Sequence, residues 1–337
     1  MRKCTFAWIT IVILFVLLSN FLFAGRQVKE EKAVKKEANK AALLLITRRG
    51  DLAAVDNCVG GMLKAEKEFD LEAKIIECRD ATEYADNIRA MVDWGADIIF
   101  CQFQPLVTPA VESARENPNI KYVLIYGNYD NPPENVLSVF YRDVEATYIA
   151  GVMAAMKTKT GKVALTTGAD IPSQRYAYNG FVQGVHSINP KIETYFAVIG
   201  SFEDIARGKE VALSLFSQGI DVICGWAAKS DHGTCEAAQE TGNYVVGLAA
   251  MVDLREKYPG VIIGQVGVDF GATVYELIKS YLNGKWEGGI KTIRTIHTHD
   301  VDFLYEPSTS DGWTEDQIVF IKKIRQDILD RKIVIKD

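Results

Sequence analysis

The feature that most constrains this fold is a regular alternation of short apolar runs with amphipathic stretches. One set of apolar runs covers residues 41–46, 73–78, 97–101, 121–126 and 137–141, and a second set covers 162–167, 193–199, 221–225, 244–248 and 261–266. Runs this apolar are typical of strands that are buried on both faces. Strands that alternate with helices form parallel sheets with right-handed crossovers. Two sets of strands therefore predict two doubly wound α/β lobes.

Amphipathic stretches between these runs predict the helices. The expected helices cover residues 53–69, 81–94, 107–115, 144–157, 204–217 and 270–282. The chain has 337 residues, of which 48% are hydrophobic, and this length is sufficient for two hydrophobic cores. We therefore expect each lobe to have a core of its own.

Charge and reactive side chains argue against several functions. The formal net charge is −6, so no basic surface is available for nucleic acid. The six cysteines form no C-x-x-C pair and are interpreted as small buried hydrophobic residues. His297 and His299 alternate along a segment that is expected to be extended, which makes a metal pair conceivable but favours a plain polar face. We expect no catalytic residues, no metal and no cofactor.

The N-terminus carries a leader-like segment. Arg2 and Lys3 precede an apolar run from residue 6 to 24, and a charged stretch follows. Residues 1–24 are interpreted as a signal peptide cut after Ala24, or as an uncleaved anchor, because the run is nearly long enough to span a bilayer. Residues 25–40 are interpreted as a charged tether. Either alternative places the body outside the cytoplasmic membrane, in the periplasm or on the outer face.

Aromatic side chains follow several of the predicted strands. In open parallel sheets, the ligand crevice lies beyond the carboxyl ends of the strands. Phe103, Tyr126, Phe202 and Trp226 all occupy such positions. We expect them to form a stacking surface for a flat ligand.

Five stretches of the sequence resemble the basic membrane protein family of substrate-binding proteins. They are "YIAGVMAA", "GKVALTTGADIP", "GFVQGVHSINP", "GSFEDIARGKEVAL" and "QGIDVI". The resemblance implies a type I periplasmic-binding-protein fold, in which two lobes are joined by three chain crossings, here near residues 139–143, 265–269 and 296–302. The N-terminal lobe would then comprise residues 41–141 and 267–297, and the C-terminal lobe residues 142–266 and 298–337. Many members deliver purine nucleosides to an ABC importer.

The resemblance also identifies pocket residues. The Gly200-Ser201-Phe202 turn is similar to the family's turn whose aromatic ring stacks on the base. Other elements depart from the family pattern: Tyr126-Gly127 stands in place of an Asp-Gly pair, Ala249-Ala250 in place of the Asp that holds ribose hydroxyls, and the Lys of a later segment is missing. Trp226 stands in place of the family's small, Gly-rich turn. These changes remove the sugar clamp and add flat apolar area.

The sequence therefore predicts a monomeric solute-binding protein that closes its lobes on a purine-like heteroaromatic compound and delivers it to an ABC transporter permease. The residues expected to contact the ligand are Phe202, Trp226, Tyr126, Phe103, Asp51, Gln102 and Gln265. Asp51 and the two glutamines would recognise ring N–H and C=O groups. Two alternatives stay open, namely a riboflavin-binding protein of the same family and a membrane-anchored sensor that does not transport.

Overall fold

The computed structural model describes residues 39–247 and 253–337. The predicted leader lies outside this part of the chain. Of the predicted tether, only Asn39 and Lys40 are described, and they belong to the first strand. Within the described part, no helix combines the length and the apolar character that crossing a bilayer requires.

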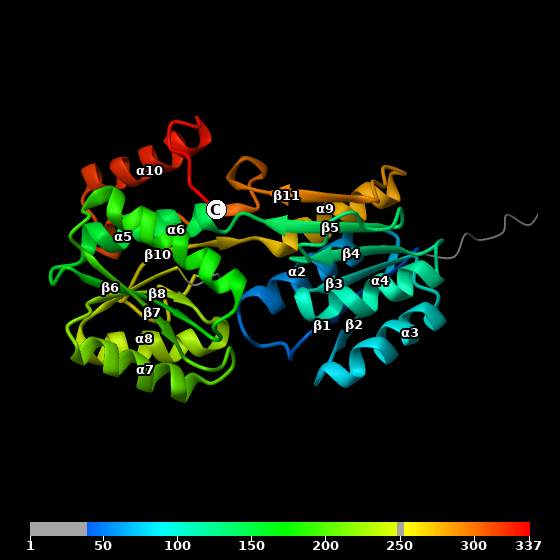
Figure 1. Ribbon diagram of the computed structural model, residues 1–337, viewed down its shortest axis with the longest axis horizontal. Coiled ribbons are helices and arrows are strands. Elements are labelled where there is room, and N and C mark those ends of the chain that lie inside the picture. Colours follow the sequence, from blue (N-terminus) through cyan, green and yellow to red (C-terminus); the bar gives the residue numbers. More distant parts are fainter. Residues whose placement is uncertain (1–38, 248–252) are drawn as a thin grey trace, which may run out of the picture. The chain divides into compact units, whose positions relative to one another are not determined.

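The first sheet has the strand order β11-β5-β4-β3-β1-β2, and the pairings between its neighbours are parallel (Figure 1). Its strands are β1 (Asn39–Leu45), β2 (Leu71–Glu77), β3 (Ile98–Gln102), β4 (Lys121–Ile125), β5 (Val136–Tyr141) and β11 (Ile290–Arg294). Leu43 of β1 pairs with Ile75 on one side and with Phe100 on the other, which sets the register of the sheet's centre.

The second sheet has the strand order β12-β10-β9-β8-β6-β7. Its strands are β6 (Lys162–Thr167), β7 (Glu193–Val198), β8 (Val222–Trp226), β9 (Tyr244–Gly247), β10 (Ile262–Val268) and β12 (Val301–Tyr305). Strand β12 runs antiparallel to β10, whereas the other pairings are parallel. The α/β fold with two parallel-dominated sheets is therefore confirmed.

Helices cover both faces of each sheet. The helices are α2 (Ala54–Glu68), α3 (Tyr84–Trp94), α4 (Val107–Glu116), α5 (Val144–Lys157), α6 (Pro172–Ile188), α7 (Ile205–Ser217), α8 (Asp231–Thr241), α9 (Phe270–Leu282) and α10 (Glu315–Leu329). In the first sheet, α2 and α9 pack on one face and α3 and α4 on the other. In the second sheet, α5 and α6 pack on one face and α7 and α8 on the other.

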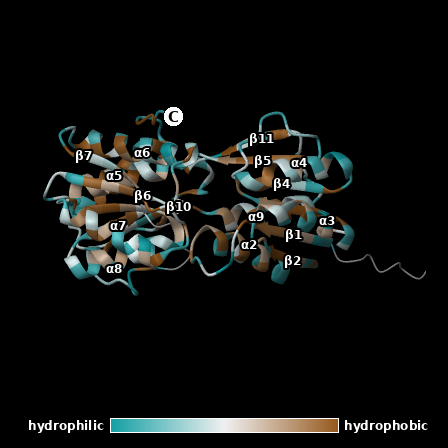
Figure 2. Ribbon diagram, turned by 60° about the horizontal axis from the view of Figure 1, so that its bottom comes forward, coloured by the Kyte–Doolittle hydropathy of each residue, from teal (hydrophilic) through white to brown (hydrophobic). Residues whose placement is uncertain are grey.

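Side-chain alternation along the strands explains this layering. Leu43 and Leu45 face the α2 side of the first sheet, whereas Ala42 and Leu44 face the α3 side. Because successive side chains of a strand point to opposite faces, an entirely apolar run has to be covered twice. The strands in Figure 2 are accordingly coloured largely as hydrophobic.

The chain passes between the two sheets at three places. It leaves the first sheet after β5, returns after β10 to form α9 and β11, and leaves again between β11 and β12. We use "first lobe" for the first sheet with its helices and "second lobe" for the second sheet with its helices.

The structure corrects the expected conformation of the segment that contains His297 and His299, and it adds two strands that the sequence did not predict. The segment with the two histidines is not extended, because Ile296–Thr298 form a 3-10 turn and His299 has a left-handed φ of 63°. A capping box closes this turn, in which Thr295 and Thr298 bond each other's backbone. The two rings therefore do not share a strand face. Strands β11 and β12, whose apolar pattern is interrupted by charged residues, do not figure in the sequence prediction.

Candidate functional site: an aromatic pocket between two sheets

A cavity of about 570 Å³ lies at the carboxyl ends of both sheets. This volume is within the range of small-molecule sites. Its walls include the ends of β3, β4 and β8, the loops before α2, α6 and α7, and the start of α9. Five of the residues predicted to contact ligand lie in these walls, namely Asp51, Phe103, Tyr126, Phe202 and Trp226.

The first lobe contributes Phe103 and Tyr126 from unusual backbone conformations. Phe103 follows β3 with a φ of 67°, and Tyr126 follows β4 with a φ of 57°. Non-glycine residues in this region are strained by about 1–3 kcal/mol and are held there by their surroundings. Both rings contact Phe270 at the start of α9, with centroid separations of 5.6 and 6.2 Å. Three aromatic rings therefore form one packed wall.

The second lobe contributes Phe202 and Trp226. Phe202 lies in the turn between β7 and α7, and Trp226 is the last residue of β8. Both side chains are half-buried. The Phe202 ring lies over the backbone of Gly168, where an added Cβ would be 2.4 Å from its Cγ atom. Phe202 and Trp226 therefore belong to the same lobe. The aromatic rings that the other lobe contributes to the cavity are Phe103 and Tyr126.

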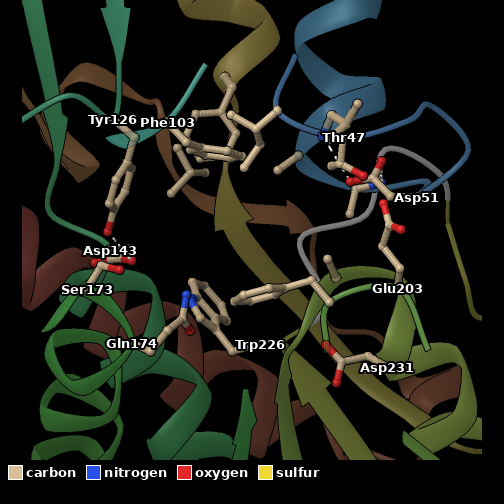
Figure 3. Close-up of a pocket in the computed structure, with 18 of the residues that line it drawn as sticks. Thr47, Asp51, Phe103, Tyr126, Asp143, Ser173, Gln174, Glu203, Trp226 and Asp231 are labelled. Atoms are coloured by element: carbon tan, nitrogen blue, oxygen red, sulfur yellow. Dashed lines mark hydrogen bonds between the residues drawn. The ribbon is translucent and has the colours of Figure 1, made fainter. Parts of the chain in front are cut away.

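Asp143 is a buried carboxylate in the pocket wall. It precedes α5, and only 3% of its surface is exposed. Its Oδ2 atom accepts a hydrogen bond of 2.7 Å from the Tyr126 hydroxyl (Figure 3). Burial raises the pKa of Asp143 to about 7, although the Tyr126 hydrogen bond opposes this shift.

Three more acidic residues line the pocket. The Asp51 carboxylate accepts backbone N–H groups of Ala53, Val55 and Asp56 at 2.9–3.0 Å, and burial nevertheless raises its pKa. Asp231 accepts from Ala227 N at 2.5 Å and from Thr166 Oγ1 at 3.1 Å, and burial raises its pKa to about 7.

Glu203 is the third of these acids and is exposed; its carboxylate points toward Asp51 in Figure 3. Among the described residues that line the pocket there is no Lys or Arg. The site is therefore aromatic and acidic.

His232 is a neutral pocket residue. Its Nδ1 atom lies 3.1 Å from the Tyr258 hydroxyl, and burial lowers the pKa of its ring to about 4. Burial raises the pKa of the nearby Cys235 thiol well above its ordinary value, so this cysteine is not an activated nucleophile. In residues 39–247 and 253–337, no group of three His, Cys, Asp or Glu side chains is arranged to hold a metal ion.

The structure does not place Gln102 or Gln265 in the pocket wall. Gln102 is fully buried within β3, and its Nε2 atom donates to Ala54 O at 3.1 Å and contacts Cys58 Sγ at 3.3 Å. Gln265 lies inside β10, and its Oε1 atom accepts from Leu254 N at 2.9 Å. Neither amide lines the cavity in this structure, and their contact with a ligand stays a prediction. Strand β3 ends at Gln102, just beyond the predicted run, whereas Gln265 lies within the run that predicts β10. Both side chains therefore belong to strands and hold neighbouring segments to the sheet.

Sequence reasoning missed Asp143 and Phe270 as pocket residues. Asp143 was assigned to a chain crossing, and no local pattern distinguishes it from the adjacent charged residues. Its buried position depends on the distant Tyr126. The expected loss of the ribose-binding Asp rests on Ala249-Ala250, which lie outside the described residues.

Comparison with known proteins places these observations in a family. A family model described as "ABC transporter substrate-binding protein PnrA-like" matches residues 38–337. Basic membrane protein A1 of Borrelia garinii subsp. bavariensis is 28% identical over 309 residues, which cover 88% of this chain and 89% of that protein. The ABC transporter nucleoside-binding protein BmpA of Lactococcus lactis subsp. cremoris is 25% identical, with 77% of this chain and 76% of that protein covered.

A solved structure supports the fold. An ABC transporter solute-binding protein from Aeropyrum pernix K1 superposes with a TM-score of 0.79 at 20% identity, covering 89% of this chain and 94% of that chain. Identity this low shows a shared fold and does not transfer a ligand.

Proposed function

The chain belongs to the family of PnrA-like ABC transporter substrate-binding proteins, and we propose that it captures a neutral, purine-like heteroaromatic compound outside the cytoplasm for an importer. The observation that carries this proposal is the pocket itself, in which Phe103 and Tyr126 of one lobe and Phe202 and Trp226 of the other line a single cavity. Aromatic side chains from two lobes provide stacking faces for a flat ring.

The capture step would be a hinge closure. Ligand stacks on the rings of one lobe, and contacts from the other lobe then stabilise the closed state. The three chain passages between the sheets supply the hinge. Closure would place the ligand between walls that exclude water, and the permease partner would recognise the closed form.

The relatives support a nucleoside-type ligand more directly than a flavin. The relative from Lactococcus lactis is named as nucleoside-binding, and by similarity this name supports a nucleoside or its base as the ligand here. The acidic, aromatic lining is also consistent with a neutral base, because a base offers N–H donors and a flat face.

Ligand identification tests the proposal. Protein purified from its native host would be denatured, and the released small molecules would be analysed by mass spectrometry. Calorimetry with adenine, guanine, hypoxanthine, their nucleosides and riboflavin would follow. We expect a purine compound in both experiments. Binding of riboflavin alone, or of none of these compounds, would overturn the purine proposal.

Trp226 provides an independent optical readout. We expect a bound purine to quench or shift Trp226 emission, because the indole lines the cavity. The chain has five tryptophans, so a Trp226→Phe variant serves as the control. Identical quenching in that variant would show that Trp226 does not contact the ligand.

A further inference from the structure

The Asp143 carboxylate has one acceptor oxygen without a partner. Its Oδ2 atom is bonded to Tyr126, whereas its Oδ1 atom is buried without a hydrogen bond of good geometry among the described residues. The backbone N–H groups of Asp143 and Val144 still act on the carboxylate and lower its pKa. An unsatisfied buried acceptor is costly and calls for an explanation. Asp143 lines the cavity, so this oxygen lies at the pocket wall, although almost none of its own surface is exposed in this conformation.

The surroundings fix the position of this carboxylate. The Tyr126 ring stacks on Tyr141 with a centroid separation of 5.7 Å and packs against Phe103 and Phe270. The phenol that holds Oδ2 therefore has little freedom to move. Asp143 also lies directly before α5, whose first turn is anchored by the hydrogen bond from Thr147 N to Asp143 O at 2.9 Å.

The neighbouring polar groups are engaged elsewhere. Arg142 binds Glu145, Asp337 and the backbone oxygen of Ile335. The Tyr176 hydroxyl donates to Asp337 Oδ1 at 3.0 Å. Neither the Arg142 guanidinium nor the Tyr176 phenol is therefore directed at Asp143 Oδ1.

The other buried acids of the pocket differ from Asp143 in this respect. Both oxygens of Asp51 accept backbone N–H groups, and both oxygens of Asp231 accept hydrogen bonds from the chain. Among the buried acids of the described lining, Asp143 is thus the one with an acceptor oxygen to spare.

We infer that Asp143 is a specificity-determining residue, whose Oδ1 atom accepts a hydrogen bond from an N–H or NH2 group on the edge of the bound ring. The site would then select heteroaromatic compounds that carry such a donor and reject flat analogues without one. A site that is built to bond a donor discriminates strongly against its absence, because the buried acceptor is left unpaired. This inference rests on the proposed function.

The test measures the affinities of the wild type and of one variant for pairs of ligands that differ in their N–H groups. The probes are adenine and hypoxanthine, each paired with a fully N-methylated counterpart that has no N–H group, namely N6,N6,9-trimethyladenine and 1,9-dimethylhypoxanthine. The variant is Asp143→Asn, which keeps the shape of the side chain, its ability to accept from Tyr126 and its compatibility with a helix start. Calorimetry gives the dissociation constants.

We expect Asp143→Asn to lower the affinity for the parent base by at least about tenfold. The affinity for its methylated counterpart should change by less than about threefold. Equal weakening of both ligands would assign Asp143 a merely structural role and overturn the inference. Unchanged binding of the parent base would overturn it as well.

Two outcomes separate this inference from the proposed function. If Asp143→Asn does not fold, the wild type decides alone, since it must bind the parent base at least about tenfold more tightly than the methylated counterpart. If wild-type protein binds none of the four probes, the proposed function fails and the inference fails with it. If it binds parent and methylated forms equally, only the inference fails.

Discussion

At the residue scale, the pocket depends on side chains that the strand ends project beyond the sheets. Phe202 illustrates this. A turn between a strand and a helix is normally exposed to solvent, yet the Phe202 ring is half-buried over Gly168 and lines the cavity. Its position is thus explained by the pocket more readily than by the main core.

Removing the Phe202 ring should weaken ligand binding. We expect Phe202→Ala to reduce the affinity for adenine or hypoxanthine by about 1–3 kcal/mol, the scale of one base–aromatic stack. Calorimetry measures the effect. Phe320→Ala is the matched control, because this ring is 39% exposed on α10 and does not line the pocket. Equal affinity in both variants would refute stacking by Phe202.

Asp143 should make the stability of the ligand-free protein depend on pH. Burial raises the pKa of Asp143 to about 7, whereas an unfolded Asp titrates near 4. Between these values the folded state binds more protons than the unfolded state, so the free energy of unfolding falls as pH rises. The groups that face Asp143 are Tyr126 and Tyr176, and its neighbour Arg142 is paired elsewhere.

Urea unfolding between pH 4 and pH 8 tests this dependence. We expect Asp143→Asn to lose less stability than wild type over this window, by at most about 4 kcal/mol. The comparison with the variant is needed because other groups titrate too: His232, whose pKa is lowered to about 4, gives an opposite slope at the acidic end, and Asp231 gives a parallel one. Identical slopes in wild type and variant would contradict the raised pKa of Asp143.

At the element scale, helices α5 and α6 pack closely against each other on one face of the second sheet. Their backbones touch at glycines, since an added Cβ at Gly151 would lie 2.2 Å from Phe181 O and one at Gly184 would lie 2.0 Å from Tyr148 O. Both helices begin at the pocket, α5 next to Asp143 and α6 with Ser173 and Gln174 in the wall. Their close packing therefore positions functional groups.

A Cβ between these helices should destabilise the protein. We expect Gly151→Ala to lower the free energy of unfolding by about 1–3 kcal/mol, because the helices cannot separate without losing contacts. Urea titration checks this value. Val319→Ala, at a position on α10 that is 64% exposed, should change the stability by less than about 0.5 kcal/mol. A Gly151→Ala variant as stable as this control would show that the interface is loosely packed.

The sheets show how far sequence patterns determine elements. Strand β6 and helices α5 and α9 begin and end where the apolar and amphipathic patterns predict. Strands β3 and β10 extend further, because neighbouring strands continue their ladders beyond the apolar run. The extension of β3 matters, since it makes Gln102 a strand residue whose side chain points into the protein.

At the scale of the whole molecule, the two lobes together form an acidic pocket without Lys or Arg in its described lining. Such a site disfavours anions, because a phosphate would have to be buried near carboxylates without a compensating cation.

Phosphorylation of the ligand should therefore abolish tight binding. We expect adenosine 5′-monophosphate to bind at least about 30-fold more weakly than adenosine, given the cost of burying its charge near carboxylates. Calorimetry at two salt concentrations measures the ratio of the two affinities and shows how far salt screens the electrostatic repulsion. Equal affinities for the nucleoside and its phosphate would show that a cation outside the described lining balances the charge.

The sugar is expected to add little affinity. The family resemblance implies that Ala249-Ala250 stand in place of the ribose-binding Asp and that the Lys of a later segment is missing. We expect adenosine to bind no better than adenine. A nucleoside more than about 100-fold tighter than its base, or ~2.7 kcal/mol, would show that another residue holds the ribose.

The sequence by itself determined the fold class, because entirely apolar strands alternating with amphipathic helices leave a sheet covered on both faces as the stable arrangement. It also determined which aromatic residues lie at strand ends, namely Phe103, Tyr126, Phe202 and Trp226. Only the tertiary structure decided which polar groups accompany them. Tyr126 meets Asp143 across 17 residues, and Gln265 meets Leu254 instead of lining the cavity. The physical reason is that the direction of a polar side chain depends on partners contributed by other segments, whereas strand and helix patterns are local.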